Sequence, residues 1–462
     1  MAISAEATRG SLERRVSDGL LWLGCLLYAA LFTFLGAVKY AAHRNLVDFG
    51  IFQQTVASAF GCFCNPLEGS HWAFHFSPIL YLAAAAVAVV HSPLTLVALQ
   101  AIAGALCAPP VYGIVRARAD VSTARLAAVV AWLYPPLAGL VFGDFHENGF
   151  APAAVAWSLY AFDAGALTIS GLFAAVVLAV KEDQAIFLAC AELGMAFAYR
   201  GDARRWRFAV GVALVSLAVE AVFFLVIEPH ANALPAWQPT RFFAWTGADR
   251  HALFPRGILE RIGFLALILA PLAFVPLRTR AIVITLAPLV EVLASRMSTT
   301  FTLGSHYAGA WIGYVLVAFA TGIGQLAERN RARLTLYWAL GLCVVEFAVA
   351  NPLHPGLNLR ARQARDVALD AALARIPRDA SVATQEEAYT HLALDDPYVR
   401  LLPEDPRVET QACFVLIDRD FPNSPRLREY GSALTTLVRN GVYVPVGKEG
   451  GIELYRRSAR CR

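Results

Sequence analysis

The sequence is a succession of apolar stretches separated by short polar segments. Eleven stretches stand out: residues 18–38, 96–115, 122–142, 149–164, 166–181, 184–199, 207–227, 258–276, 279–295, 305–325 and 332–351. A helix needs about 20 apolar residues to cross a bilayer, and several stretches fall short of this. The pattern predicts an α-helical polytopic membrane protein of about eleven spans, with its termini on opposite sides.

Composition supports this class of protein. The chain has 462 residues, of which 58% are hydrophobic and 16% charged, which excludes a single soluble core. The first stretch follows Arg14-Arg15 and shows no small-residue cleavage site, so we expect a retained anchor. The short stretch 78–90 would disturb the charge pattern if it crossed, and we expect a juxtamembrane helix with both ends outside.

The basic residues predict the orientation, because cytoplasmic loops carry the excess of Lys and Arg. In the eleven-span layout fifteen fall in short loops on the N-terminal side, eight fall in longer loops on the other side, and sixteen lie after about residue 355. We therefore expect a multi-pass plasma-membrane protein with a cytoplasmic N-terminus and an extracytoplasmic C-terminal part. The net charge of +4 says little, because it averages a basic inner face with mixed outer loops. We expect no nucleic-acid partner.

Two domains are predicted. Residues 1–355 form a transmembrane domain with outer loops 39–95 and 228–257, and residues 356–462 form a small α/β domain with a hairpin turn at 448–451. The loop 228–257 interleaves aromatic and basic residues. This composition is typical of an interfacial aromatic belt, and it also suits a lid over a phosphate-bearing lipid.

Ionisable side chains gather on the outer side of this layout, where groups near hydrocarbon are costly and therefore indicate function. Four separate segments contribute them: Asp48; His71 and His75; Asp144, His146 and Glu147; and Lys181, Glu182 and Asp183. Their convergence on one membrane face predicts a site at the lipid surface.

Each cluster also has a structural interpretation. Asp48 is either the N-cap of a helix over 49–60 or a general base with raised proton affinity. Asp144 and Glu147 either lie in a solvated loop or clamp a substrate or a metal ion. Lys181-Glu182-Asp183 is either a self-neutralised turn or a phosphate site, and His71 and His75 alone indicate a metal only weakly.

The last polar turn and two intramembrane acids complete the candidates. Arg296, His306 and Tyr307 are expected to hold a phosphate leaving group, whereas Glu220 and Glu291 are as readily explained by hydrogen bonds within the bundle. Cysteines 25, 107, 190 and 343 are expected in the core. Cysteines 62, 64, 413 and 461 lie outside, where disulfides form, and we consider a Cys413–Cys461 bridge.

Several motifs together resemble the prokaryotic family called domain of unknown function 2079. They are Asp48-Phe49-Gly50-Ile51-Phe52-Gln53-Gln54, His75-Phe76-Ser77-Pro78, the Gln100 segment, Asp144-Phe145-His146-Glu147, Lys181-Glu182-Asp183 and Ser305-His306-Tyr307. The family in turn resembles the GT-C class of membrane glycosyltransferases, which share an acid in the first outer loop and an acidic motif in the second. Where better-known members carry His-Pro-Pro or Glu-Lys-Pro, this chain has the His75 motif.

The resemblance implies a GT-C-like fold and transfer of a sugar from a polyprenyl-phosphate donor to an acceptor at the outer face. It makes Asp48 the catalytic base, Asp144 and Glu147 the second-loop acids, and the remaining polar residues the substrate-binding set: Gln53, His75, His146, Lys181, Glu182, Asp183, Arg296, His306 and Tyr307. Membrane lipids are expected partners, and a divalent cation is left open. The alternatives are a transporter and a lipid-binding or non-catalytic scaffold subunit.

Overall fold

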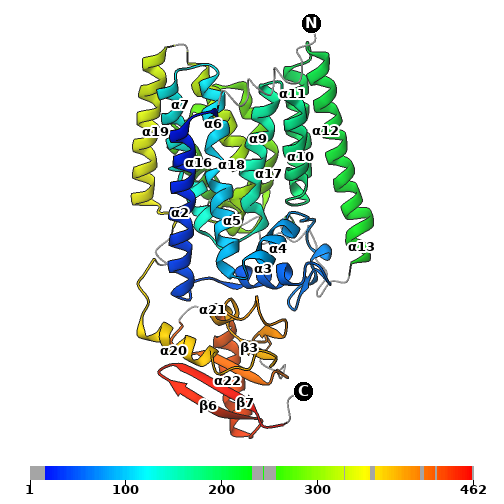
Figure 1. The fold of residues 1–462 in the computed structure, drawn as a ribbon, viewed down its shortest axis with the longest axis vertical. Coiled ribbons are helices and arrows are strands. Elements are labelled where there is room, and N and C mark those ends of the chain that lie inside the picture. Colours follow the sequence, from blue (N-terminus) through cyan, green and yellow to red (C-terminus); the bar gives the residue numbers. More distant parts are fainter. Residues whose placement is uncertain are drawn as a thin grey trace.

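A helical bundle joined to a small sheet domain makes up the protein. The computed structural model describes residues 16–231, 243, 256–326, 328–353, 359–405, 410–421 and 424–459, and at 425 and 429 only the backbone. The first described helix, α2 (Gly19–Ala41), runs along the bundle toward the C-terminal domain (Figure 1). The predicted helical membrane protein with a C-terminal sheet domain is confirmed at this level.

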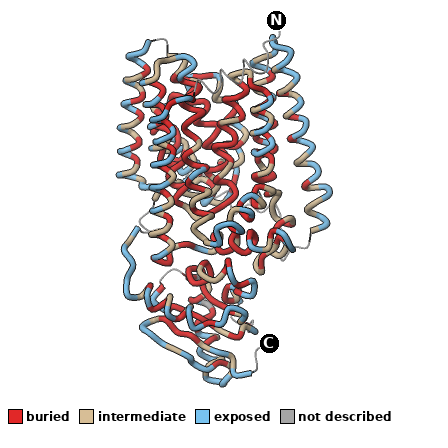
Figure 2. The backbone as a smooth tube through the Cα atoms, in the orientation of Figure 1, coloured by how far each residue is buried: buried red, intermediate tan, exposed pale blue. Residues whose placement is uncertain are grey.

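The remaining helices of the bundle have the following bounds: α3 (Val47–Ala57), α4 (Leu80–Val89), α5 (Pro93–Ala105), α6 (Ala108–Arg116), α7 (Val121–Trp132), α8 (Pro135–Phe142), α9 (Ala151–Asp163), α10 (Leu167–Leu178), α11 (Asp183–Ala198), α12 (Ala203–Val222), α13 (Glu228–His230), α16 (Ile258–Leu269), α17 (Leu286–Ala294), α18 (Ile312–Gly324) and α19 (Arg329–Val349). The central helices α9 and α18 are buried along their length, whereas α12 and α19 expose apolar side chains at the rim (Figure 2).

By length and composition, fewer of the described helices qualify as membrane spans than the eleven apolar stretches suggest. Among the described residues, four helices are long and apolar enough to cross a membrane: Gly19–Ala41, Pro93–Arg116, Ala203–His230 and Arg329–Val349. The pair α7 and α8 makes a fifth if it is one span bent by 48°. Pro135 and Pro136 stand at this bend, and proline removes a helical hydrogen bond and kinks the chain.

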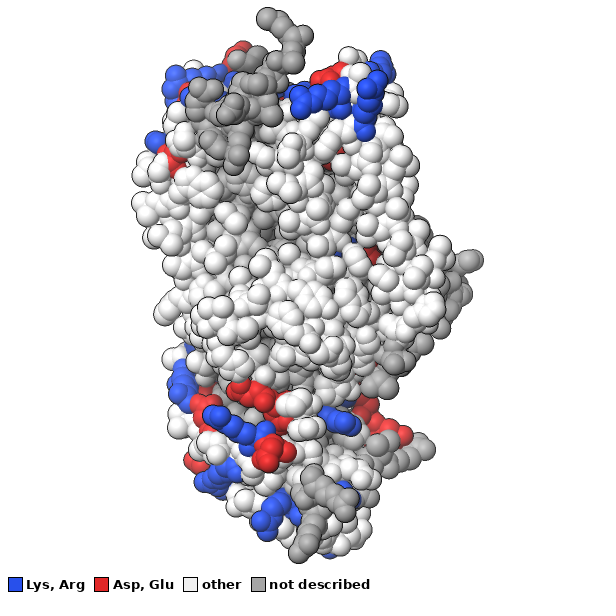
Figure 3. Space-filling model, turned by 45° about the vertical axis from the view of Figure 1, so that its right-hand side comes forward, with Lys and Arg blue, Asp and Glu red and all other residues white. Residues whose placement is uncertain are grey.

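Charge divides the molecule into three zones. Lys and Arg crowd the end of the bundle far from the C-terminal domain, a broad belt is almost without charge, and both signs mix over the C-terminal domain (Figure 3). Leucines such as Leu26 and Leu27 on α2 are more than 60% exposed. An apolar surface of that extent suits contact with lipid.

The apolar stretches 258–276 and 279–295 do not form two continuous helices. After α16 the chain takes left-handed backbone angles at Ala273 and Phe274, with φ of 50° and 55°. It then continues in the short 3₁₀ helices Val275–Arg278 and Arg280–Thr285 before α17. Uninterrupted hydropathy gave no sign of this sharp turn, although Pro271 and Pro276 flank it.

The C-terminal domain holds a five-stranded mixed sheet in the order β4-β3-β5-β7-β6. Its strands are β3 (Val382–Thr384), β4 (Val399–Leu401), β5 (Phe414–Asp418), β6 (Tyr443–Glu449) and β7 (Ile452–Arg457), and its helices are α20 (Ala364–Leu373), α21 (Glu386–Tyr389) and α22 (Pro425–Arg439). Strands β6 and β7 pair antiparallel with Glu449 opposite Ile452. The predicted hairpin turn is therefore confirmed, with Gly450 at a φ of 58°.

The outer loop of the bundle carries the C-terminal domain. Gln54 of α3 donates to the backbone oxygens of Asp396 and Val399 at 3.2 and 3.1 Å, and its amide oxygen accepts from the Tyr389 hydroxyl. Helix α4 lies beside α3 at this end of the bundle (Figure 1). The juxtamembrane placement expected for residues 78–90 stays a prediction.

Three of the four cysteines expected in the core are buried, and two of those expected outside form a disulfide with each other. Cys62 and Cys64 form a disulfide, and Cys25, Cys107 and Cys343 are buried. Cys190 is exposed on α11 and is not a core residue. Cys413 is disulfide-bonded, while its predicted partner, residue 461, lies outside the described residues.

Candidate functional site

A cavity of about 480 Å³ lies within the bundle next to the outer loop. Predicted site residues from four segments line it together: His75, His146, Lys181, Glu182, Asp183, His306 and Tyr307. The convergence expected from the sequence therefore exists in the fold. A cavity on which several ionisable groups converge is a candidate binding site.

Glu182 fixes one wall of the cavity. It is the residue before α11, and its carboxylate accepts from His75 Nδ1 and from the Phe76 backbone N–H, both at 2.9 Å. Burial opposes protonation of His75, but the Glu182 charge outweighs it and raises the His75 pKa. The same pairing holds the pKa of Glu182 below its usual range despite burial. The two side chains therefore form a buried ion pair that anchors the first outer loop to α11.

Lys181 supplies positive charge to the cavity. Its Nζ lies 3.2 Å from Asp183 Oδ2 and 6.0 Å from the centre of the Tyr307 ring. Among the described residues that line the cavity, Lys181 is the one Lys or Arg. A cation held in place by a carboxylate and facing a cavity suits an anionic ligand.

Two histidines lead from this wall to Asp48. The rings of His146 and His306 stack with centroids 3.9 Å apart, and His306 Nδ1 lies 3.8 Å from Asp48 Oδ2. Burial lowers the His146 pKa well below the usual range, so this imidazole is neutral. Asp48 thus lies beside the cavity, next to His306, which lines it.

Asp48 is not a helix cap. Helix α3 begins at Val47 with Leu46 as its N-cap, so Asp48 lies within the first turn. Surrounding protein, followed by the negative charges of Asp144, Glu68 and Glu147, raises its pKa to about 7, while 45% of the side chain remains exposed. The structural interpretation as a cap is therefore wrong, and the carboxyl has a raised proton affinity at a partly exposed position.

Asp144 has a different environment from Asp48. It pairs with Lys39 Nζ at 2.8 Å and accepts from Asn45 Nδ2 at 2.8 Å and from the Leu46 N–H at 2.7 Å. All these partners belong to the end of α2 and the turn into α3. Asp144 therefore joins the Asp144–Glu147 segment to the turn before Asp48. It does not lie in a solvated loop.

Glu147 is also buried rather than solvated. Its side chain is 0% exposed, and one carboxylate oxygen lies 2.8 Å from His146 Nδ1. It stands behind the cavity wall, where its charge raises the pKa of Asp48 and of His75. Its place fits an electrostatic role better than contact with a substrate.

Three further predicted residues are not part of the cavity lining formed by the described residues. Gln53 is fully buried in α3, and among the described residues its amide has no hydrogen-bond partner. His71 is buried against Phe52 and Phe63. Arg296 is exposed and is not part of the cavity lining formed by the described residues.

Glu220 and Glu291 line the cavity, although the sequence equally allowed both of them a role in bundle packing. Each is a carboxylate on an apolar segment, which was the available signal. Phe243, from the long outer loop, also lines the cavity. Most of that loop lies outside the described residues, so the aromatic-belt and lid interpretations stay predictions.

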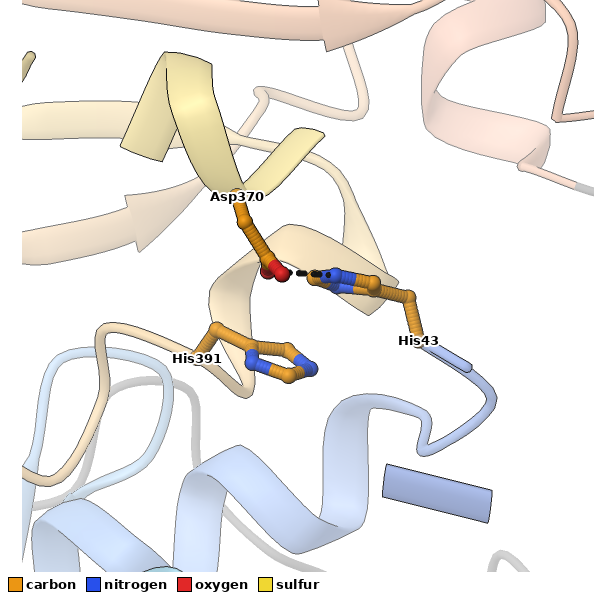
Figure 4. Close-up of side chains that lie close together, drawn as sticks. All are labelled: His43, Asp370 and His391. Carbon is orange, nitrogen blue, oxygen red and sulfur yellow. Dashed lines mark hydrogen bonds and ion pairs between the residues drawn. The ribbon is translucent and has the colours of Figure 1, made fainter. Parts of the chain in front are cut away.

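Metal-binding geometry is found elsewhere in the structure. In the described part of the chain one group of His, Cys, Asp or Glu side chains brings three ligand atoms within 4.8 Å of one another, namely His43, Asp370 and His391 (Figure 4). The cavity carboxylates Asp183, Glu220 and Glu291 are oxygen donors of the kind that Mg²⁺ or Mn²⁺ takes, but they do not form such a group.

Comparisons with known proteins agree with the fold and the motifs. Residues 43–454 match the model of the family described as predicted membrane protein (DUF2079). ArnT from Cupriavidus metallidurans bound to undecaprenyl phosphate is similar in structure, with a TM-score of 0.55 and 11% identity over 95% of this chain and 98% of that one. The apo form of ArnT gives 0.52 and 12% over 94% and 97%. No curated protein matches the sequence.

Proposed function

The chain belongs to the DUF2079 family of predicted membrane proteins, and from this premise we propose that it transfers a sugar from a polyprenyl-phosphate donor to an acceptor at the extracytoplasmic face. The observation that carries the proposal is the proximity of Asp48 to the cavity. A carboxyl with a pKa of about 7 lies 3.8 Å from His306, which lines a cavity that also contains Lys181. A base and a cation near one cavity are what such a transfer needs.

The reaction proceeds by one displacement with inversion. Asp48 accepts the proton of the acceptor hydroxyl, whose oxygen attacks the anomeric carbon of the donor. The bond from that carbon to the phosphate oxygen breaks, and the polyprenyl phosphate leaves with both electrons. Lys181 and protonated His75 face the departing charge and stabilise it, while fixed side chains hold the two substrates in line.

The other polar residues act through these groups. Asp144 is a positioning residue, because it holds the turn before Asp48 and raises the Asp48 pKa. Glu147 adds to the same field. His146, Asp183, His306 and Tyr307 shape the cavity around sugar and phosphate, and Glu182 orients His75. Gln53 and Arg296 have no direct role in this proposal.

The proposal includes the finer topology. Eleven crossings, a cytoplasmic N-terminus and an extracytoplasmic C-terminal domain starting near residue 356 place the cavity at the outer membrane surface. The structural likeness to a protein bound to undecaprenyl phosphate supports a polyprenyl lipid as one partner. A divalent cation between phosphate and the cavity carboxylates is compatible with their chemistry.

The test uses the full chain in proteoliposomes with a panel of radiolabelled polyprenyl-phosphate sugars. Wild-type protein transfers label to acceptor, and Asp48→Asn loses transfer while keeping its melting temperature. Asp395→Asn is the matched control, because Asp395 is a 64% exposed acid on the outer part of the chain. Equal transfer by Asp48→Asn and wild type contradicts the proposal. Solute flux without transfer across the whole panel favours the transporter instead.

A further inference from the structure

The end of α2 and the C-terminal domain meet at a cluster of two histidines and one aspartate (Figure 4). His43 follows α2, Asp370 lies on α20, and His391 follows α21. His43 Nε2 lies 2.9 Å from Asp370 Oδ1, and the His43 and His391 ring centroids are 3.9 Å apart. None of the three lines the cavity, and none is used in the proposed reaction.

The cluster contains features that packing alone does not explain. His391 Nε2 and His43 Nδ1 are buried without a hydrogen-bond partner among the described residues. His43 takes a left-handed φ of 50°, a strained conformation for a residue other than glycine, which often marks a functional site. Two neighbouring imidazoles with unpaired ring nitrogens are donors of the kind that a metal ion takes.

We propose that His43, Asp370 and His391 bind a zinc ion that fastens the C-terminal domain to the bundle. Two imidazoles and one carboxylate form a typical zinc donor set. The three ligand atoms lie within 4.8 Å of one another, and donors around zinc are about 3.3 Å apart. The two imidazole rings, now 33° apart in orientation, have to turn toward the ion to complete the site. Asp370 is 40% exposed, which leaves an entry path and room for a water as fourth ligand.

The surroundings support ligand orientation. A His391 ring nitrogen hydrogen-bonds the Tyr40 backbone, and the ring stacks on the Tyr40 side chain at 4.0 Å. Arg362 pairs with Asp370 Oδ2, which leaves Oδ1 directed at His43. Such outer contacts orient metal ligands, although the Arg362 charge weakens affinity for a cation.

The site has a consequence for the outer loop. Asn45 and Leu46, two and three residues after His43, donate hydrogen bonds to Asp144 and lead into α3. A zinc ion at His43 would therefore restrain the turn that presents Asp48 as well as the docked domain. The inference itself does not depend on the proposed transfer, since it is tested by zinc binding alone.

The experiment uses the full chain in detergent, carrying a tag without histidines and stripped with a chelator. Zinc is titrated, bound zinc is measured by elemental analysis, and the melting temperature is followed. Wild type binds one equivalent through this site and melts at higher temperature with zinc. His391→Asn and Asp370→Asn each weaken this binding by at least about tenfold, the lower end of the range for outer-shell partners, whereas His391→Cys retains it because a thiolate also ligates zinc.

His91→Asn is the matched control. The His91–Asp395 pair, 2.6 Å apart, also joins the bundle to the C-terminal domain, but it has no second histidine. This variant should bind zinc as wild type does. Equal zinc binding by wild type and His391→Asn overturns the proposal. Equal loss in His91→Asn and His391→Asn also overturns it, because docking of the domain, rather than ligation, would then explain the loss.

Discussion

Lys39 Nζ lies 2.8 Å from Asp144 Oδ1, and the two side chains are 1% and 13% exposed. The pair joins the last turn of α2 to the Asp144–Glu147 segment, 105 positions later in the sequence. Lys39 also donates to the Phe142 backbone oxygen at 3.2 Å. One buried cation therefore holds together the two segments that carry the acidic motifs.

Replacing Lys39 with methionine should destabilise the protein strongly. Asp144 would remain buried without its counter-charge, and breaking such a pair typically costs about 3–5 kcal/mol. Thermal unfolding in detergent measures the effect. Arg256→Met provides the control, because Arg256 pairs with Glu260 on the surface at 88% exposure and should change stability by less than about 0.5 kcal/mol. Similar losses in both variants would contradict a special role for the Lys39–Asp144 pair.

The raised pKa of Asp48 predicts the pH dependence of transfer. The carboxylate is the active form of a general base, so kcat/KM should rise with pH through about 7. Glu68 is among the charges that raise this pKa, so Glu68→Gln favours the ionised form and should move the rise to lower pH. Steady-state rates from pH 5 to pH 9 test both statements. A profile that is flat through pH 7, or a shift to higher pH in Glu68→Gln, would be inconsistent with Asp48 as the base.

Lys181 and Arg296 should differ in their effect on lipid binding, although both were predicted to bind the phosphate. Lys181 faces the cavity and Arg296 does not. We expect Lys181→Met to weaken binding of undecaprenyl phosphate by about tenfold or more, since a charge-assisted hydrogen bond to phosphate is lost, and Arg296→Met to change it less than twofold. Thermophoresis with labelled protein measures both.

Because Lys181→Met leaves Asp183 unpaired, the double variant Lys181→Met/Asp183→Asn is measured alongside it. It removes the stranded charge and separates lost lipid contact from lost stability. If the double variant binds the lipid as wild type does, Lys181 does not hold the phosphate.

Local patterns predicted much of the fold, because an apolar run or an alternating run needs only its own residues to be recognised. Helix α19 (Arg329–Val349) matches the stretch 332–351, and the β6–β7 hairpin matches its predicted turn. The left-handed turn at Ala273 and Phe274 was missed, because uniform hydropathy does not report backbone angles. The sequence predicted that the site residues lie at one membrane face, but it did not predict which side chains pair with one another.

Partners from distant segments decided what each acid does. Asp48 and Asp144 were both predicted to belong to the catalytic site. In the structure Asp144 forms an ion pair with Lys39, whereas Asp48 stays accessible next to His306. Glu220 of α12 and Glu291 of α17 both line the cavity, because the two helices border it. Such long-range pairings follow from the packing of the bundle, and a single sequence does not contain them in readable form.

Gly50 should control docking of the C-terminal domain. A Cβ at this position of α3 would overlap the ring of Tyr389, whose hydroxyl donates to Gln54. Gly50→Ala therefore displaces Tyr389 and should weaken docking by about 1–3 kcal/mol, as overpacking does. Hydrogen exchange of α21 and of the Asp396–Val399 segment should speed up, while exchange in α9 and α18 stays unchanged. Gly61→Ala is the control, because its Cβ would meet Ser58 O at an ordinary 3.5 Å. Unchanged exchange in Gly50→Ala would show that the Tyr389 contact does not hold the domain in place.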